Sequence, residues 1–364
     1  MQHNFSQLRP LSPLAKYVAG TCVVLITYAS LYPFTGWHWS GLPIFDFLTA
    51  SWPRWFTWGD LILNVLGYIP LGFSLCAALP HRWSRLRAAK WSIVLCFFLS
   101  FGLETLQNFL PTRVASNVDI GTNTLGAFLG AGLALCFGDR FFATHAGLHR
   151  WRMHRLVAGR PGEFGLILIG MWLLAQCSPG LRIFEFGRLV GFWELWQQNV
   201  YSPLRFVTTE AIAVCLHMLA TGGFMLCLLN RASLRLIYLV LLLGIGLRSA
   251  AIGMHYDSAS VWMWLTPGAC LGLVMGGVLL CYLARRSRAG LFRVCMVCLF
   301  LSVLSANLVP INPYYAEISP SFRGLNFFGF TYWVSVFWPL LVFCFMCLPA
   351  VHRQMVKRSF LNYF

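Results

Sequence analysis

Ten apolar segments alternate along this chain with short polar segments. A helix that crosses the hydrocarbon core of a bilayer needs about 20 mostly apolar residues, and segments of this length favour helices over strands. We expect spanning helices at residues 16–36, 60–79, 88–110, 119–137, 163–178, 208–229, 233–254, 260–283, 290–310 and 328–349. The fifth segment is the shortest. The pattern predicts an all-α fold, a polytopic transmembrane helical bundle of about ten spanning helices.

Composition and charge agree with a membrane location. Of the 364 residues, 58% are hydrophobic and 10% are charged, and the mean hydropathy is +0.68. A soluble domain carries roughly 25% charged residues. The 27 basic residues lie in short clusters between the apolar segments, which argues against a nucleic-acid partner. With the N-terminus inside, 20 of them fall on the inner side and seven on the outer side. The positive-inside rule therefore predicts that both termini are cytoplasmic.

The 13 cysteines lie almost entirely within the apolar segments, including Cys295 with Cys298 and Cys344 with Cys347. Paired cysteines of this spacing hold metals in soluble proteins, but no His or Asp flanks them here. We expect small buried apolar side chains, with neither a metal site nor a cofactor.

Seven polar side chains interrupt the second, third and fourth apolar segments and the turn between the last two. Helical spacing places each pair within a segment on one helix face, and the order of the segments brings all seven to the outer end of the bundle. This polar cluster comprises Asp60, Asn64, Glu104, Gln107, Arg113, Asp119 and Asn123. A charged side chain at bilayer depth costs about 2.5–3.5 kcal/mol, so we expect Arg113 or a shared proton to compensate Glu104. The cluster is either a binding site or a set of hydrogen bonds that joins the helices.

Small residues and one proline mark expected packing features in the same region. Gly126 and Gly130 form a GxxxG pair, which permits close approach of a neighbouring helix. Pro70, two residues before Gly72, removes a backbone donor near the middle of its helix. It predicts either a functional break or a simple kink.

The order and spacing of these residues resemble the VanZ-like family. The resemblance rests on Asp60-x3-Asn64-x5-Pro70-x-Gly72, on Glu104-x2-Gln107, and on Arg113-x5-Asp119-x3-Asn123-x2-Gly126, with Tyr32-Pro33-Phe34 before them. It covers residues 16–137. It implies an integral protein of the bacterial cytoplasmic (inner) membrane, and the founding member is associated with resistance to the lipoglycopeptide teicoplanin. The resemblance implies no reaction.

A degenerate second copy of the four-helix unit is expected at residues 163–283. Thr124–Gly130 recurs as Thr266–Gly272, Ala29–Pro33 compares with Ala175–Pro179, and Asp60 aligns with Glu210. The two copies would be parallel, and two further helices would follow them. The domains expected are 1–140 (VanZ-like), 141–162 (a basic cytoplasmic loop), 163–285 (the second copy) and 286–364 (two helices and a basic tail).

Two segments between the helices carry their own expectations. Residues 181–206 mix aromatic and charged side chains, among them Phe192, Trp193 and Trp196, which predicts an interfacial helix lying flat on the membrane. The loop that contains His145, His149 and His154 is basic, and we expect it to contact anionic headgroups rather than a metal.

Three functions remain open from the sequence. In the first, the polar cluster forms an outer-leaflet pocket that binds a lipid-linked cell-wall precursor or an amphiphilic glycopeptide, with Arg113 on a phosphate or carboxylate. In the second, the carboxylates act as acid and base on a lipid-linked substrate. A transporter is the third, because transporters often consist of repeats, although the polar residues form no path across the membrane. Binding leads, and membrane lipids are the further partners that we expect.

Overall fold

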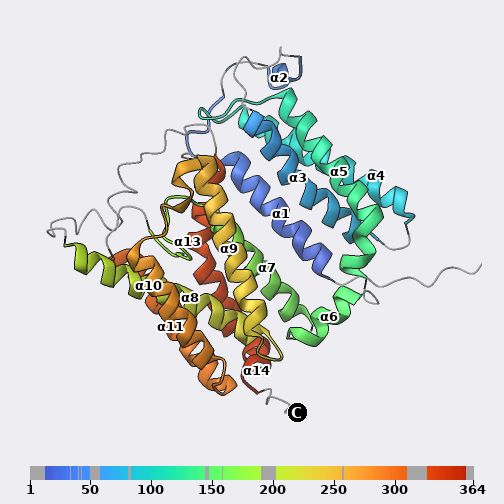
Figure 1. Cartoon of the computed structure of the whole chain (residues 1–364). Coiled ribbons are helices and arrows are strands. Elements are labelled where there is room, and N and C mark those ends of the chain that lie inside the picture. Colours follow the sequence, from blue (N-terminus) through green and yellow to red (C-terminus); the bar gives the residue numbers. More distant parts are fainter. Residues whose placement is uncertain are drawn as a thin grey trace, which may run out of the picture. The chain divides into compact units, whose positions relative to one another are not determined.

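The computed structural model is a bundle of helices divided into two compact units, residues 1–154 and 155–364 (Figure 1). It describes residues 13–32, 34–39, 41, 43–49, 58–80, 83–143, 147–157, 159–189, 202–255, 258–309 and 326–357. Within these ranges no strand occurs, and the one β-bridge joins Leu156 to Leu229. The all-α prediction is confirmed.

The first unit is built on four long helices. They are α1 (Leu14–Leu31), α3 (Trp58–Ala78), α4 (Arg85–Gln107) and α5 (Asn117–Phe142), which pack side by side (Figure 1). Two short helices accompany them, α2 (Asp46–Thr49) before α3 and α6 (Gly147–Arg155) after α5.

The second unit contains the remaining helices. In chain order these are α7 (Arg160–Ala175), α8 (Pro203–Leu228), α9 (Leu234–His255), the 3-10 helix η2 (Ser258–Trp262), α10 (Pro267–Leu283), α11 (Arg288–Leu308), α13 (Asn326–Cys347) and α14 (Pro349–Lys357). Helix α8 lies at its centre and is almost completely buried by its neighbours.

Nine of the ten predicted segments each coincide with one helix, whereas segment 260–283 begins in η2 and α10 starts only at Pro267. Eight of the described helices are long and apolar enough to cross a membrane. The other two are shorter: α7 has 16 residues and α10 has 17. The helix boundaries could be predicted from the sequence because the thickness of the bilayer sets the length of the apolar segments.

Hydroxyl side chains start several of these helices. Ser84, Ser116, Thr266 and Ser287 each precede a helix and accept a hydrogen bond from a backbone N–H in its first turn. Such caps satisfy donors that have no partner within the helix. They fix the starts of α4, α5, α10 and α11.

Helices α3 and α5 cross in close backbone contact, and glycine makes that contact sterically allowed. A Cβ atom on Gly126 would collide with the Val65 carbonyl oxygen, and one on Gly130 with the Ile69 carbonyl oxygen. From the other side, a Cβ on Gly72 would collide with the backbone of Ala127. Pro70 lies inside α3, which continues through it to Ala78, and its side chain is exposed.

The segment after α7 corrects one expectation. Residues 181–189 are not helical, although a flat interfacial helix was expected there, and Leu181 to Arg188 are buried in the second unit. Gly187 donates its N–H to the Ser335 carbonyl of α13 at 2.9 Å. Irregular backbone is tolerated among membrane helices where protein encloses it. Phe192, Trp193 and Trp196 lie outside the described residues.

The α3–α5 crossing yields a matched pair of variants. Gly130→Ala should destabilise the protein by about 1–3 kcal/mol, because the new methyl group has no room against α3. Gly132→Ala, two residues away in open space, should be neutral or stabilising, since alanine is the better helix former. Thermal unfolding in detergent measures both. Equal melting temperatures for the two variants would contradict this account of the crossing.

Candidate functional site

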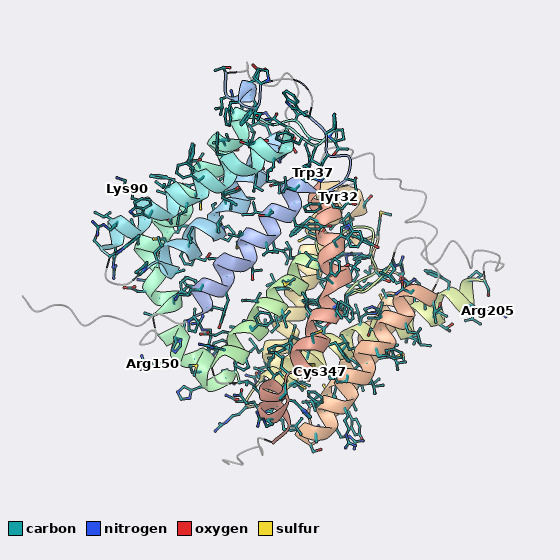
Figure 2. The ribbon with its side chains drawn as sticks, turned by 180° about the vertical axis from the view of Figure 1, so that it is seen from behind. Tyr32, Trp37, Lys90, Arg150, Arg205 and Cys347 are labelled. Carbon is teal, nitrogen blue, oxygen red and sulfur yellow. The ribbon has the colours of Figure 1, made fainter. Side chains whose placement is uncertain are left out.

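The predicted polar residues lie at one end of the first unit. Asp60 and Asn64 are in the first turns of α3, Glu104 and Gln107 in the last turn of α4, and Asp119 in the first turn of α5. The C-terminal end of α1 meets them there. Figure 2 labels Tyr32 and Trp37 at this end, and Arg150 on α6 lies beyond the other end of the unit. We call the end that carries Asp60, Glu104 and Asp119 the polar end.

Asp119 lies at the centre of the charges. The Asn64 side-chain nitrogen donates to an Asp119 carboxylate oxygen at 2.9 Å, which ties α3 to α5. Asp119 also interacts electrostatically with the carboxylates of Asp60 and Glu104. The side chains of Asp60, Asn64 and Asp119 are all partly accessible. Three interacting acids therefore lie at the ends of α3, α4 and α5.

Glu104 holds the start of α5. Its side chain is buried, and one carboxylate oxygen accepts the backbone N–H of Ser116, the capping residue of α5, at 2.9 Å. A hydrogen bond to a charged acceptor is stronger than a neutral one. The carboxylate is thus partly compensated by backbone as well as by the nearby Arg113.

Arg113 binds the end of α1. Its Nε donates to the Tyr32 carbonyl at 3.2 Å and a terminal nitrogen donates to the Ala29 carbonyl at 2.5 Å. Gln107 adds a bond to the Ser30 carbonyl at 3.1 Å. Burial lowers the pKa of the Arg113 guanidinium, and the Glu104 carboxylate opposes that shift. Arginine remains protonated in proteins, so a positive charge rests at the negative end of the α1 dipole.

Asn123 lies one turn deeper than the rest of the cluster. It is buried, and its side-chain nitrogen donates to the Ser100 hydroxyl of α4 at 2.9 Å. This bond joins α5 to α4 below the carboxylates. The structure therefore gathers six of the seven residues at the helix ends and places the seventh within the helix packing.

Sequence reasoning missed the backbone partners and one group of charges. The carbonyls of Ala29 and Tyr32 carry no side-chain signal, whereas Ser116, three residues before Asp119, has the spacing of a helix cap.

In the second unit, Glu185 accepts from Arg188 at 2.8 Å and from the Arg182 backbone N–H at 2.7 Å, and all three residues are buried. The spacing of three residues between these charged side chains was the sequence feature that could have predicted their pairing.

Among the described residues, no group of three His, Cys, Asp or Glu side chains could hold a metal ion. His149 and His154 lie on α6, while His145 falls outside the described ranges.

The comparisons with known proteins agree with the motif. Residues 13–138 match the family model VanZ/LLP1. This segment is a VanZ-like domain. The match spans α1 to α5 and contains every residue of the polar cluster. No curated protein and no solved structure matches the chain. The chain is thus a multi-pass membrane protein with a VanZ-like domain at its N-terminal side.

The bond between Glu104 and Ser116 can be tested in the VanZ-like domain. Glu104→Ala leaves the Ser116 N–H buried without its acceptor, which costs about 1–3 kcal/mol. Glu104→Gln keeps an acceptor and should cost less. Thermal unfolding in detergent ranks the three proteins, and amide hydrogen exchange at the start of α5 should accelerate only in the alanine variant. Unchanged exchange there would show that Glu104 does not hold α5.

Proposed function

We propose that the VanZ-like domain binds the polar part of an amphiphilic cell-envelope molecule at Asp60, Asn64 and Asp119. Candidate ligands are a lipid-linked cell-wall component and an amphiphilic glycopeptide such as teicoplanin. The observation that carries this proposal is the grouping of the Asp60 and Asp119 carboxylates, with Asn64 bonded to Asp119, at the ends of spanning helices. Helix packing alone has no need of two adjacent like charges, which repel each other.

The chemistry of the cluster suits a ligand rich in hydrogen-bond donors. Ionised carboxylates only accept hydrogen bonds, so sugar hydroxyls and ammonium groups are the complementary groups. Arg113 was expected to meet a ligand phosphate, but it donates to the end of α1. We therefore assign Arg113 a positioning role, in which it holds α1 beside the carboxylates.

Aromatic side chains near the polar end support a location at the membrane surface. Trp37, Trp39 and Trp58 are exposed there, and tryptophan is enriched where hydrocarbon meets headgroups. At the opposite end of the VanZ-like domain, Arg85 of α4 pairs with Asp139 of α5. The distribution of basic residues favours the outer leaflet of the bacterial cytoplasmic membrane for the polar end, with both termini cytoplasmic.

An enzyme is the second candidate. Glu104 is buried and Asp119 is partly exposed, and the two carboxylates interact. Pairs of acids in unlike environments serve as general acid and base in many enzymes. A transporter has less support, since the cluster of the VanZ-like domain lies at one end of its helices.

We also propose that α7 to α10 are a degenerate copy of the four long helices of the VanZ-like domain. Gly126 and Gly130 face the carbonyls of Val65 and Ile69, and 142 residues later Gly268 and Gly272 face the carbonyls of Val207 and Ala211. One register thus relates both crossings.

This register changes one alignment. Glu210 corresponds to Tyr68, while Asp60 corresponds to Ser202, so the sequence alignment of Asp60 with Glu210 is shifted. The acids of the first unit have no equivalents in the second, which favours a single site of this kind. An experimental structure in which α8 and α10 cross in another register would contradict the duplication.

The binding proposal predicts the effect of two variants, one single and one double, on antibiotic susceptibility. In a susceptible host, wild-type protein should protect against teicoplanin, whereas Asp119→Asn should lose part of that protection and Asp60→Ala/Asp119→Ala nearly all of it, because acceptors for ligand donors are removed. Minimum inhibitory concentration is the readout, with membrane levels checked by blot.

Asp139→Asn provides the matched control, since Asp139 lies on the same helix at its other end. It should protect like the wild type. Full protection by the double variant would reduce the cluster to a structural role, and complete loss with Asp119→Asn alone would favour the enzyme. If the wild type gives no protection, direct binding of teicoplanin or a lipid-linked wall precursor to purified wild type and double variant decides the proposal.

A further inference from the structure

Six arginines are exposed at one end of the second unit. They belong to the turn after α8, the first turn of α9, the turn between α10 and α11, the first turns of α11, and α14: Arg231, Arg235, Arg285, Arg286, Arg293 and Arg353. The described residues between 211 and 357 contain no Asp or Glu. We call this group the arginine collar.

Contacts within the second unit bring these elements together. The buried Arg288 donates to the carbonyls of Leu229 at 2.5 Å and Asn230 at 2.6 Å, which fixes the start of α11 against the turn after α8. Phe292 of α11 stacks on His352 of α14 with ring centroids 4.8 Å apart. The collar is therefore one surface assembled from several helix ends.

The collar lies where spanning helices end. Helices α8, α11 and α13 are long enough to cross a membrane, and Figure 2 shows Cys347, the last residue of α13, far from Arg205 at the start of α8. Helix α14 follows α13 directly. It packs Val351 and Met355 into the hydrophobic core of the second unit and leaves His352 and Arg353 exposed.

We propose that the arginine collar binds the headgroups of anionic phospholipids, with α14 as its interfacial element. The position at the ends of membrane helices places the guanidinium groups at headgroup level, where phosphate is the abundant acceptor. Guanidinium binds phosphate oxygens in bidentate fashion, and clusters of basic residues beside spanning helices recognise anionic lipids. The described residues 211–357 carry no acid to offset these charges, and Glu163, in the first turn of α7 beside the end of α8, is buried, so the exposed surface is positive.

The experiment uses the full-length protein purified in a neutral detergent. Thermal unfolding is recorded with added phosphatidylglycerol or with phosphatidylcholine of the same acyl chains. Phosphatidylglycerol should raise the melting temperature by about 2–4 °C more than phosphatidylcholine, because a ligand that binds the native state stabilises it. High salt should abolish the difference, since exposed charges are screened.

Variants then locate the effect. Arg285→Gln/Arg293→Gln/Arg353→Gln should lose at least half of the phosphatidylglycerol-specific shift, and the corresponding lysine variant should keep most of it. Arg205→Gln removes an exposed arginine at the opposite end of α8 and should keep the full shift.

Native mass spectrometry of the wild type, reconstituted with both lipids in equal amounts, provides a readout that needs no variant. Preferential retention of phosphatidylglycerol is expected. Equal retention of the two lipids, or a full shift in the glutamine variant, would overturn the proposal. Stabilisation by soluble polyanions but not by phosphatidylglycerol would instead point to an acidic macromolecule.

Discussion

The ends of membrane helices leave backbone carbonyls without partners, and in this protein arginine side chains satisfy them. Arg113 donates to the end of α1, and Arg248 donates to the carbonyl of Ser178 just after α7. Arg288 reaches four carbonyls at and after the end of α8. Unpaired backbone groups are costly away from water, and the last turn of a helix attracts positive charge. One guanidinium group both donates hydrogen bonds to these carbonyls and places a positive charge at the helix end.

This use of arginine explains the composition of the polar end. Arg113 beside α1 interacts electrostatically with the buried Glu104 carboxyl group, which also accepts the Ser116 N–H. The bond of Glu104 fixes the first turn of α5, where Asp119 lies. Asp119, which remains partly accessible, is thus positioned by the fixed start of α5 and by the bond from Asn64.

The sequence predicted much of the fold because lipid restricts the choices. Apolar segments such as 208–229 can only be helices in a bilayer, and alternating helices must bring Asp60, Glu104 and Asp119 to the same end. Irregular backbone was not predictable in this way. Arg182, Glu185 and Arg188 among aromatic residues are typical of a membrane surface, and only contacts with distant helices, such as the bond from Gly187 to Ser335, bury them. The partners of Arg113 were equally hidden, since carbonyl groups occur at every residue.

The hydrogen bonds of the polar end differ in how far they reach along the chain. Glu104 bonds Ser116, which is 12 residues later in the chain, whereas Asn64 bonds Asp119, which is 55 residues later. During synthesis, α3 and α4 therefore leave the ribosome before the groups that complete α3 exist. The glycines of α5 that contact the α3 backbone lie on the same helix as Asp119. The helix contacts and hydrogen bonds of this domain are therefore complete only once its last long helix has been made.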